Sequence, residues 1–177
     1  MGTSARSSLR RQVSRLLLPF LFAAAGVLAF AVPAGGEASH AGWPAIGNHE
    51  GHPGGESGVL RGLDGVHNEL LGGPGNDTIY AGNEGDVIWG DSNAADNPTT
   101  QKDELYGGPG NDWIYASHGY NHIWTGAGND HIALVYGHGI VDCNGPGVKT
   151  LVVRYLPQNR PWKLIGCSHK VIVLYRA

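Results

Sequence analysis

Large apolar residues recur at every ninth position through the middle of the chain. In an extended backbone the two neighbours of each apolar residue point the opposite way, so each unit predicts a three-residue strand with one side chain inward. One longer interval holds eight extra positions within the polar stretch 91–102, which predicts a loop insertion. The apolar series consists of Leu70, Ile79 and Ile88, then Leu105, Ile114, Ile123, Ile132 and Val141. The pattern predicts an all-β array of short strands and turns over residues 61–142.

The turns between these strands carry acids and glycines at fixed places. Two segments, GGPGNDTIY at 72–80 and GGPGNDWIY at 107–115, differ at only one position. Glycines let backbone carbonyls converge on one centre, and an acid two residues before the apolar position adds a charged oxygen. Such oxygen ligands suit calcium, whereas zinc and copper favour the thiolates and imidazoles that these positions lack. The predicted metal ligands are Asp77, Asp86, Asp103, Asp112 and Asp130, with Asn121 and the glycines Gly72, Gly73, Gly75, Gly107, Gly108, Gly110, Gly126 and Gly128.

The unit G-G-x-G-x-D-x-U-x, with U a large apolar residue, resembles the repeat of the hemolysin-type, or RTX (repeats in toxin), family. The resemblance covers residues 62–142 and implies a parallel β-roll whose six-residue turns bind calcium. In such a roll successive units lie on opposite edges. One edge then holds Asn68, Asp86, Asp112 and Asp130, and the other holds Asp77, Asp103, Asn121 and Gly139. The resemblance implies two calcium sites on the first edge, one on the second and a weaker one beside Asn121, and it places a cation, Lys149, where the array ends.

Charge and composition point to an ion requirement. Residues 61–142 hold twelve Asp and Glu against two Lys and Arg, a balance that self-repels and argues against nucleic acid as a partner. Each nine-residue unit buries a single large apolar side chain while ordering several glycines, whose backbone entropy opposes folding. Burial alone therefore does not hold the turns, and we expect the chain to fold when it binds calcium.

The N-terminus predicts export. Basic residues precede the apolar run 16–32, and small residues follow it, as in a signal peptide over residues 1–41 with cleavage after Ala34 or Ala41. An uncleaved anchor is the rival interpretation, and the choice between Sec and twin-arginine export stays open. After cleavage we expect no membrane span and an extracellular protein. Residues 42–60, rich in Gly, His and Pro, are interpreted as a flexible leader.

The C-terminal residues 143–177 predict a cap. They contain apolar or alternating runs that are typical of strands, six Lys and Arg, and no acid. Cys143 and Cys167 are the chain's two cysteines, and an oxidising compartment favours a disulfide between them. The segments VDCNGPG and LIGCS also resemble the terminal segments of secreted actinobacterial members of the repeat family, which pair two such cysteines.

Aromatic residues often occupy the last position of a unit. Alternation sorts them into two rows on the outer faces, which either stabilise neighbouring strands or bind a glycan or the cell envelope. No nucleophile-elbow, zinc-protease or phosphate-loop motif occurs, so we expect no enzymatic activity. The favoured function is a secreted, structural or adhesive calcium-binding β-roll, and the alternative is a glycan or envelope binder. The rows are Tyr80, Tyr106 and Trp124 on one face, and Trp89 and Tyr115, with Trp113 beside them, on the other.

Overall fold

The computed structural model describes residues 42–52, 54–91, 98–154, 162–167 and 171–175 of the 177-residue chain. The predicted signal peptide lies outside these ranges. The described residues form thirteen β-strands and no helix. Among them, accordingly, no helix is long and apolar enough to cross a membrane.

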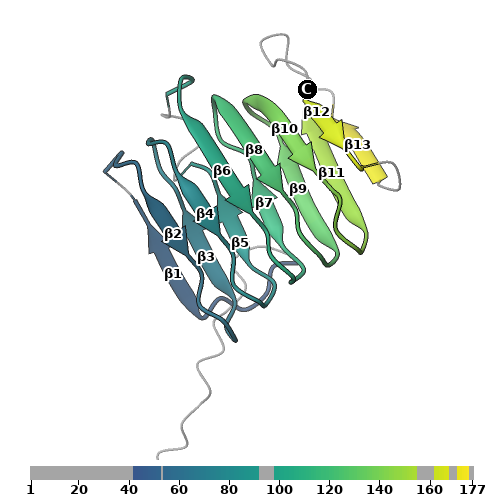
Figure 1. Cartoon of the computed structure of the whole chain (residues 1–177), viewed down its shortest axis with the longest axis horizontal. Helices are drawn as coiled ribbons and strands as arrows, with labels where there is room; N and C mark the ends of the chain where they lie inside the picture. Colours follow the sequence, from purple (N-terminus) through teal and green to yellow (C-terminus); the bar gives the residue numbers. More distant parts are fainter. Residues whose placement is uncertain (1–41, 53, 92–97, 155–161, 168–170, 176–177) are drawn as a thin grey trace, which may run out of the picture. The chain divides into compact units, whose positions relative to one another are not determined.

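The strands form two parallel sheets that the chain visits in alternation (Figure 1). Every adjacent pair is parallel, so each sheet grows by one strand per two units. The prediction of an all-β parallel β-roll is confirmed. Sheet A contains β1 (Asn48–Gly51), β3 (Asn68–Leu71), β5 (Val87–Trp89), β7 (Trp113–Tyr115), β9 (Asp130–Leu134), β11 (Lys149–Arg154) and β13 (Val171–Tyr175). Sheet B contains β2 (Val59–Arg61), β4 (Thr78–Tyr80), β6 (Lys102–Tyr106), β8 (Tyr120–Trp124), β10 (His138–Asp142) and β12 (Lys163–Ile165).

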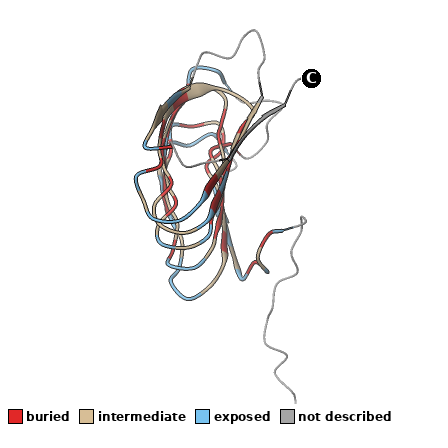
Figure 2. Ribbon diagram, turned by 90° about the vertical axis from the view of Figure 1, so that its right-hand side faces the viewer, coloured by how far each residue is buried: buried red, intermediate tan, exposed pale blue. Residues whose placement is uncertain are grey.

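The core is a double column of the apolar residues that recur every nine positions. In sheet A, Leu70 pairs in register with Ile88, and Ile88 pairs with Ile114. In sheet B, Ile79 pairs with Leu105 in the same way. All of these side chains are fully buried, and Figure 2 shows the buried positions between the two layers. The insertion predicted at 91–102 falls between β5 and β6, and residues 92–97 lie outside the described part of the chain.

Residues 42–60, predicted to be a flexible leader, contain regular β-structure. Strand β1 pairs with β3, and β2 pairs with β4, so the leader supplies the first strand of each sheet. Trp43 and Ile46 are buried against Val87 on the outer face of sheet A. The Trp43 indole nitrogen also donates a hydrogen bond of 2.9 Å to the Tyr115 hydroxyl. The leader is ordered because it covers an aromatic face and a sheet edge that would otherwise meet water.

The C-terminal cap continues the same two sheets. Strand β11 pairs with β9, and β12 pairs with β10, all in parallel. Cys143, just after β10, and Cys167, just after β12, form the predicted disulfide, with their Cα atoms 5.1 Å apart. The disulfide therefore joins two neighbouring coils of sheet B.

Candidate calcium-binding turns

The polar residues of the repeat lie inside the roll, at its two edges. Because side chains alternate along an extended backbone, a residue two positions before the inward apolar residue also points inward. The register of the strands stacks these residues in the two series that the repeat predicts. All of those that the structure brings together are at most 1% exposed: Asn68, Asp86, Asp112, Asp130 and Lys149 on the first edge, and Asp77, Asp103 and Asn121 on the second.

One oxygen of each stacked carboxylate ties two coils together. The backbone N–H of Asp86 donates to Asp112 Oδ1 over 2.8 Å, and the N–H of Asp112 donates to Asp130 Oδ1 over 3.0 Å. On the second edge the N–H of Asp77 donates to Asp103 Oδ1 over 2.9 Å. This relay leaves the second carboxylate oxygen available inside each turn.

The Oδ2 atoms of the stacked aspartates differ in whether they have a hydrogen-bond or ion-pair partner. Asp86 Oδ2 accepts the backbone N–H of Gly82, and Asp130 Oδ2 lies 2.7 Å from the Lys149 ammonium. By contrast, the Oδ2 atoms of Asp77 and Asp112 are buried with no hydrogen-bond partner among the described residues. A buried carboxylate oxygen without a partner is costly, so these two atoms identify the turns where a cation is needed.

The electrostatics of the carboxylates agree with this requirement. The pKa of Asp112 is raised to about 9, chiefly by burial; the neighbouring carboxylates of Asp130 and Asp86 add to the rise, and a backbone hydrogen bond opposes it. Burial likewise raises the pKa of Asp103 to about 7 and shifts the pKa values of Asp77 and Asp86 upward. Without a cation these groups resist ionisation, because negative charge is crowded where little water reaches.

Glycines allow successive turns to stack backbone on backbone. Gly126 has a φ of +75°, and a Cβ there would lie 1.9 Å from the carbonyl oxygen of Gly108. Gly128 has a φ of +94°, and a Cβ there would lie 1.8 Å from the carbonyl oxygen of Gly110. No other residue fits this close approach. The carbonyl-rich turns can therefore supply oxygen ligands beside the aspartates. The described residues contain no group of three or more His, Cys, Asp and Glu placed to hold a metal ion, so a metal bound here would also need carbonyl ligands.

The turn around Asn121 is filled by side chains. Asn121 Nδ2 donates to the carbonyl of Ser117 over 3.0 Å, and Asn121 Oδ1 accepts the backbone N–H of Ser117 over 3.0 Å. The Ser117 hydroxyl and the Gln101 amide both donate to Asp103 Oδ2. Sequence reasoning missed three buried residues: Asp91 and Gln101 flank the insertion, and Ser117 stands where the repeat has its second glycine. The only sequence signal for them is that they interrupt the repeat.

The aromatic residues form the two predicted rows, and their ring faces cover one another. In sheet B the Tyr106 ring stacks on Tyr80 at 4.6 Å and on Trp124 at 4.3 Å. The guanidinium of Arg61 lies 4.1 Å from the Tyr80 ring centroid, and His122 stacks on Trp124. A sugar that binds an aromatic residue packs on a ring face, and these faces are already occupied. The row therefore stabilises neighbouring strands.

The row on sheet A is covered as well. Trp89 stacks on Tyr115 with centroids 4.0 Å apart, and the leader residue Trp43 contacts both rings. Trp113 stacks on His131 at 4.1 Å. The rings of both faces thus contribute to strand packing, whichever further contacts they make.

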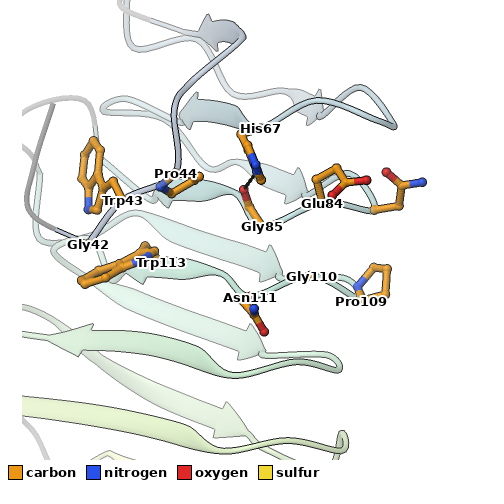
Figure 3. Close-up of a pocket in the computed structure, with 11 residues that line it drawn as sticks. Gly42, Trp43, Pro44, His67, Glu84, Gly85, Pro109, Gly110, Asn111 and Trp113 are labelled. Atoms are coloured by element: carbon orange, nitrogen blue, oxygen red, sulfur yellow. Dashed lines mark hydrogen bonds between the residues drawn. The ribbon is translucent and has the colours of Figure 1, made fainter. Parts of the chain in front are cut away.

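A hollow of about 410 Å³ lies beside the leader, with Trp43 and Trp113 on one side and Glu84 and Pro109 on the other (Figure 3). Several of its polar groups already hold the turns together. His67 Nδ1 is 2.5 Å from the carbonyl oxygen of Gly85, for example. The hollow is thus formed by the outer side of the turns on the first edge.

Comparison with known proteins agrees with this geometry. Residues 62–94 and 99–133 match the family model of the RTX calcium-binding nonapeptide repeat, which describes four copies of the repeat. No curated protein and no solved structure matches the chain. The two matched ranges contain the turns of Asp77, Asp86, Asp103, Asp112 and Asp130. Over residues 62–94 and 99–133, the chain is thus similar to the RTX calcium-binding nonapeptide repeat.

Proposed function

We propose that this protein is a secreted calcium-binding β-roll with a structural or adhesive role, and that it folds when it binds calcium. The observation that carries the proposal is the buried, unpartnered Oδ2 of Asp112, in the middle of the first edge. Asp77 Oδ2 provides the same observation on the second edge. Both atoms lie in turns that match a calcium-binding repeat.

The stacked turns indicate which residues would hold the ions. On the first edge an ion would lie between the turns of Asp86 and Asp112, and another between the turns of Asp112 and Asp130. On the second edge an ion would lie between the turns of Asp77 and Asp103. Calcium prefers six to eight oxygen ligands, which aspartates and turn carbonyls can provide together. When bound, the ion supplies the positive charge that the buried carboxylates lack.

Folding on binding follows from the way the coils are joined. The hydrogen bonds that tie Asp86 to Asp112 and Asp112 to Asp130 use the same carboxylates that would bind calcium. An ion shared by two turns would therefore couple neighbouring coils, so that binding energy becomes folding energy. Extracellular modules bind calcium at about 10⁻⁴–10⁻³ M, which fits a chain that folds after export.

Secretion is part of the proposal and has separate support. The basic and apolar N-terminal segment is typical of a signal peptide. The disulfide between Cys143 and Cys167 suits an oxidising compartment. The likeness of the cysteine segments to secreted actinobacterial proteins supports the same location. The proposal includes no catalysis, and it ranks a glycan-binding role second because the ring faces of the aromatic rows are covered.

Isothermal titration calorimetry of the secreted protein with calcium tests the proposal. We expect saturable binding at sub-millimolar to millimolar calcium and much weaker binding of magnesium, which demands stricter geometry. The Asp112→Asn variant, compared with Asp64→Asn at an exposed acid, should lose affinity while the control does not. Absence of calcium binding by the secreted wild-type protein would overturn the proposal.

A further inference from the structure

The largest fully buried side chain of the described residues is a lysine. Lys149 begins β11 and pairs in register with Asp130 of β9, so it takes the place that an aspartate takes in the preceding turns. Its turn lies beyond residue 133, where the match to the repeat family ends. A buried ammonium is tolerated only when oxygen atoms surround it.

Three oxygen atoms surround the Lys149 ammonium. Asp130 Oδ2 lies 2.7 Å from Nζ, and Nζ donates to the carbonyl of Gly128 over 2.7 Å and to the carbonyl of Pro146 over 3.0 Å. Two of these atoms belong to the turn before and one belongs to the lysine's own turn. The ammonium thus sits between two stacked turns and contacts a carboxylate and backbone carbonyls, which are ligand types that calcium uses.

The opposite end of the same edge is closed in a comparable way. Asn68 Nδ2 donates to the carbonyls of Leu63 and Val66 and to Asp86 Oδ1, at 2.9 to 3.1 Å. Side-chain nitrogen donors therefore fill the first and last gaps between turns. Only in the middle does a carboxylate oxygen, Asp112 Oδ2, stay without a partner among the described residues.

We propose that the Lys149 ammonium takes the place of a divalent cation, and that the oxygen cage around it is a latent calcium site. Replacing the lysine with the aspartate of the repeat would open this site. The charge balance supports the exchange: one ammonium offsets the carboxylate of Asp130, and one calcium ion would offset that carboxylate and the new one. This inference rests on the proposed function, because it assumes that the equivalent gaps between turns bind calcium.

Native mass spectrometry of the secreted protein in calcium counts the ions and tests the inference. Lys149→Asp should bind one calcium ion more than the wild type. Lys149→Met, which keeps the length of the side chain but offers no oxygen, should bind no additional ion. Lys163→Asp makes the same charge change at an exposed position of β12 and should also gain none. An equal number of ions in Lys149→Asp and the wild type would overturn the inference.

Thermal unfolding of Lys149→Asp provides a second measurement. Its midpoint should rise more steeply with calcium than that of the wild type, because the ion then replaces a permanent internal charge. A Lys149→Asp chain that does not fold in saturating calcium, while Lys163→Asp folds, would contradict the inference. If the wild type binds no calcium, the proposed function fails. In that case the latent site is still supported if Lys149→Asp binds one ion. It is overturned if Lys149→Asp binds none.

Discussion

The centre and the C-terminal end of the first edge differ in how they satisfy buried carboxylates. At the centre, Asp112 offers a buried oxygen that no described group contacts. At the end, Asp130 faces the ammonium of Lys149, and a disulfide joins the coils nearby. The same backbone geometry is thus stabilised by the chain's own groups in one region, and under the proposed function it would be stabilised by a bound cation in the other. Calcium dependence would then be a property of individual turns.

Breaking the internal ion pair should have the largest effect on stability. Asp130→Asn leaves the Lys149 ammonium buried without its counter-charge, which typically costs about 3–5 kcal/mol. The loss should appear in urea unfolding at saturating calcium, where the protein is folded. The double variant Asp130→Asn/Lys149→Met removes both charges and should recover much of the stability. A double variant no more stable than Asp130→Asn alone would contradict the pairing.

Removing the disulfide should have the next largest effect. Replacing Cys143 and Cys167 with Ala releases a loop closed across 24 residues, and such a change typically costs about 2–4 kcal/mol. Urea unfolding at saturating calcium measures the cost. Because the cap is held by the chain's own groups, we expect removal of the disulfide to destabilise any cap structure that remains without calcium by a similar amount. A variant with wild-type stability in calcium would show that the disulfide does not stabilise the protein.

Neutralising the central aspartate should have effects of opposite sign with and without calcium. Asp112→Asn removes a ligand that two gaps would share, and we expect the calcium midpoint of folding to rise about tenfold, or about 1.4 kcal/mol. In ion-free buffer the same change removes a carboxyl group whose ionisation is opposed by burial, so the variant should retain more β-structure than the wild type. Circular dichroism at both conditions measures the pair of effects. If Asp112→Asn were destabilised both with and without calcium, the proposed difference between the centre and the C-terminal end of the first edge would be wrong.

Acid should partly replace calcium at the centre. Burial raises the pKa of Asp103 to about 7 and that of Asp112 to about 9, above their ordinary range near 3.9. Between about pH 4 and 9 the folded state therefore holds protons that the unfolded state releases, and the stability of the ion-free protein falls as the pH rises. The β-structure content of dialysed protein, measured by circular dichroism, should accordingly be higher at pH 5 than at pH 9. A flat profile would indicate that these carboxylates are hydrated.

The repeat was predictable because it depends on short-range patterns. An inward apolar residue such as Ile114 and an inward aspartate such as Asp112 lie two positions apart along the chain, so one period predicts both. Strand order and edge assignment follow when that period is combined with the resemblance to the RTX repeat, which implies that successive units lie on opposite edges.

The parts that escaped prediction depend on contacts between coils. Trp43 and Ile46 follow no period, and their burial arises from a neighbouring aromatic face. The aspartates of the repeat are alike in sequence, yet only the structure shows that Gly82, Ser117 or Lys149 satisfies the Oδ2 atom of some of them. The Oδ2 atom of Asp112 has no hydrogen-bond partner among the described residues. Such differences cannot be read from the motif itself.

Calcium is proposed to supply the positive charge that the buried carboxylates of the middle turns lack. Far-ultraviolet circular dichroism during a calcium titration measures whether the chain folds when that charge is supplied. For the secreted chain we predict little β-structure in chelator and a steep, cooperative gain in millimolar calcium, because ions shared between stacked turns couple the coils. Magnesium at the same concentration should not reproduce the gain. A spectrum that is unchanged between chelator and millimolar calcium would contradict the account.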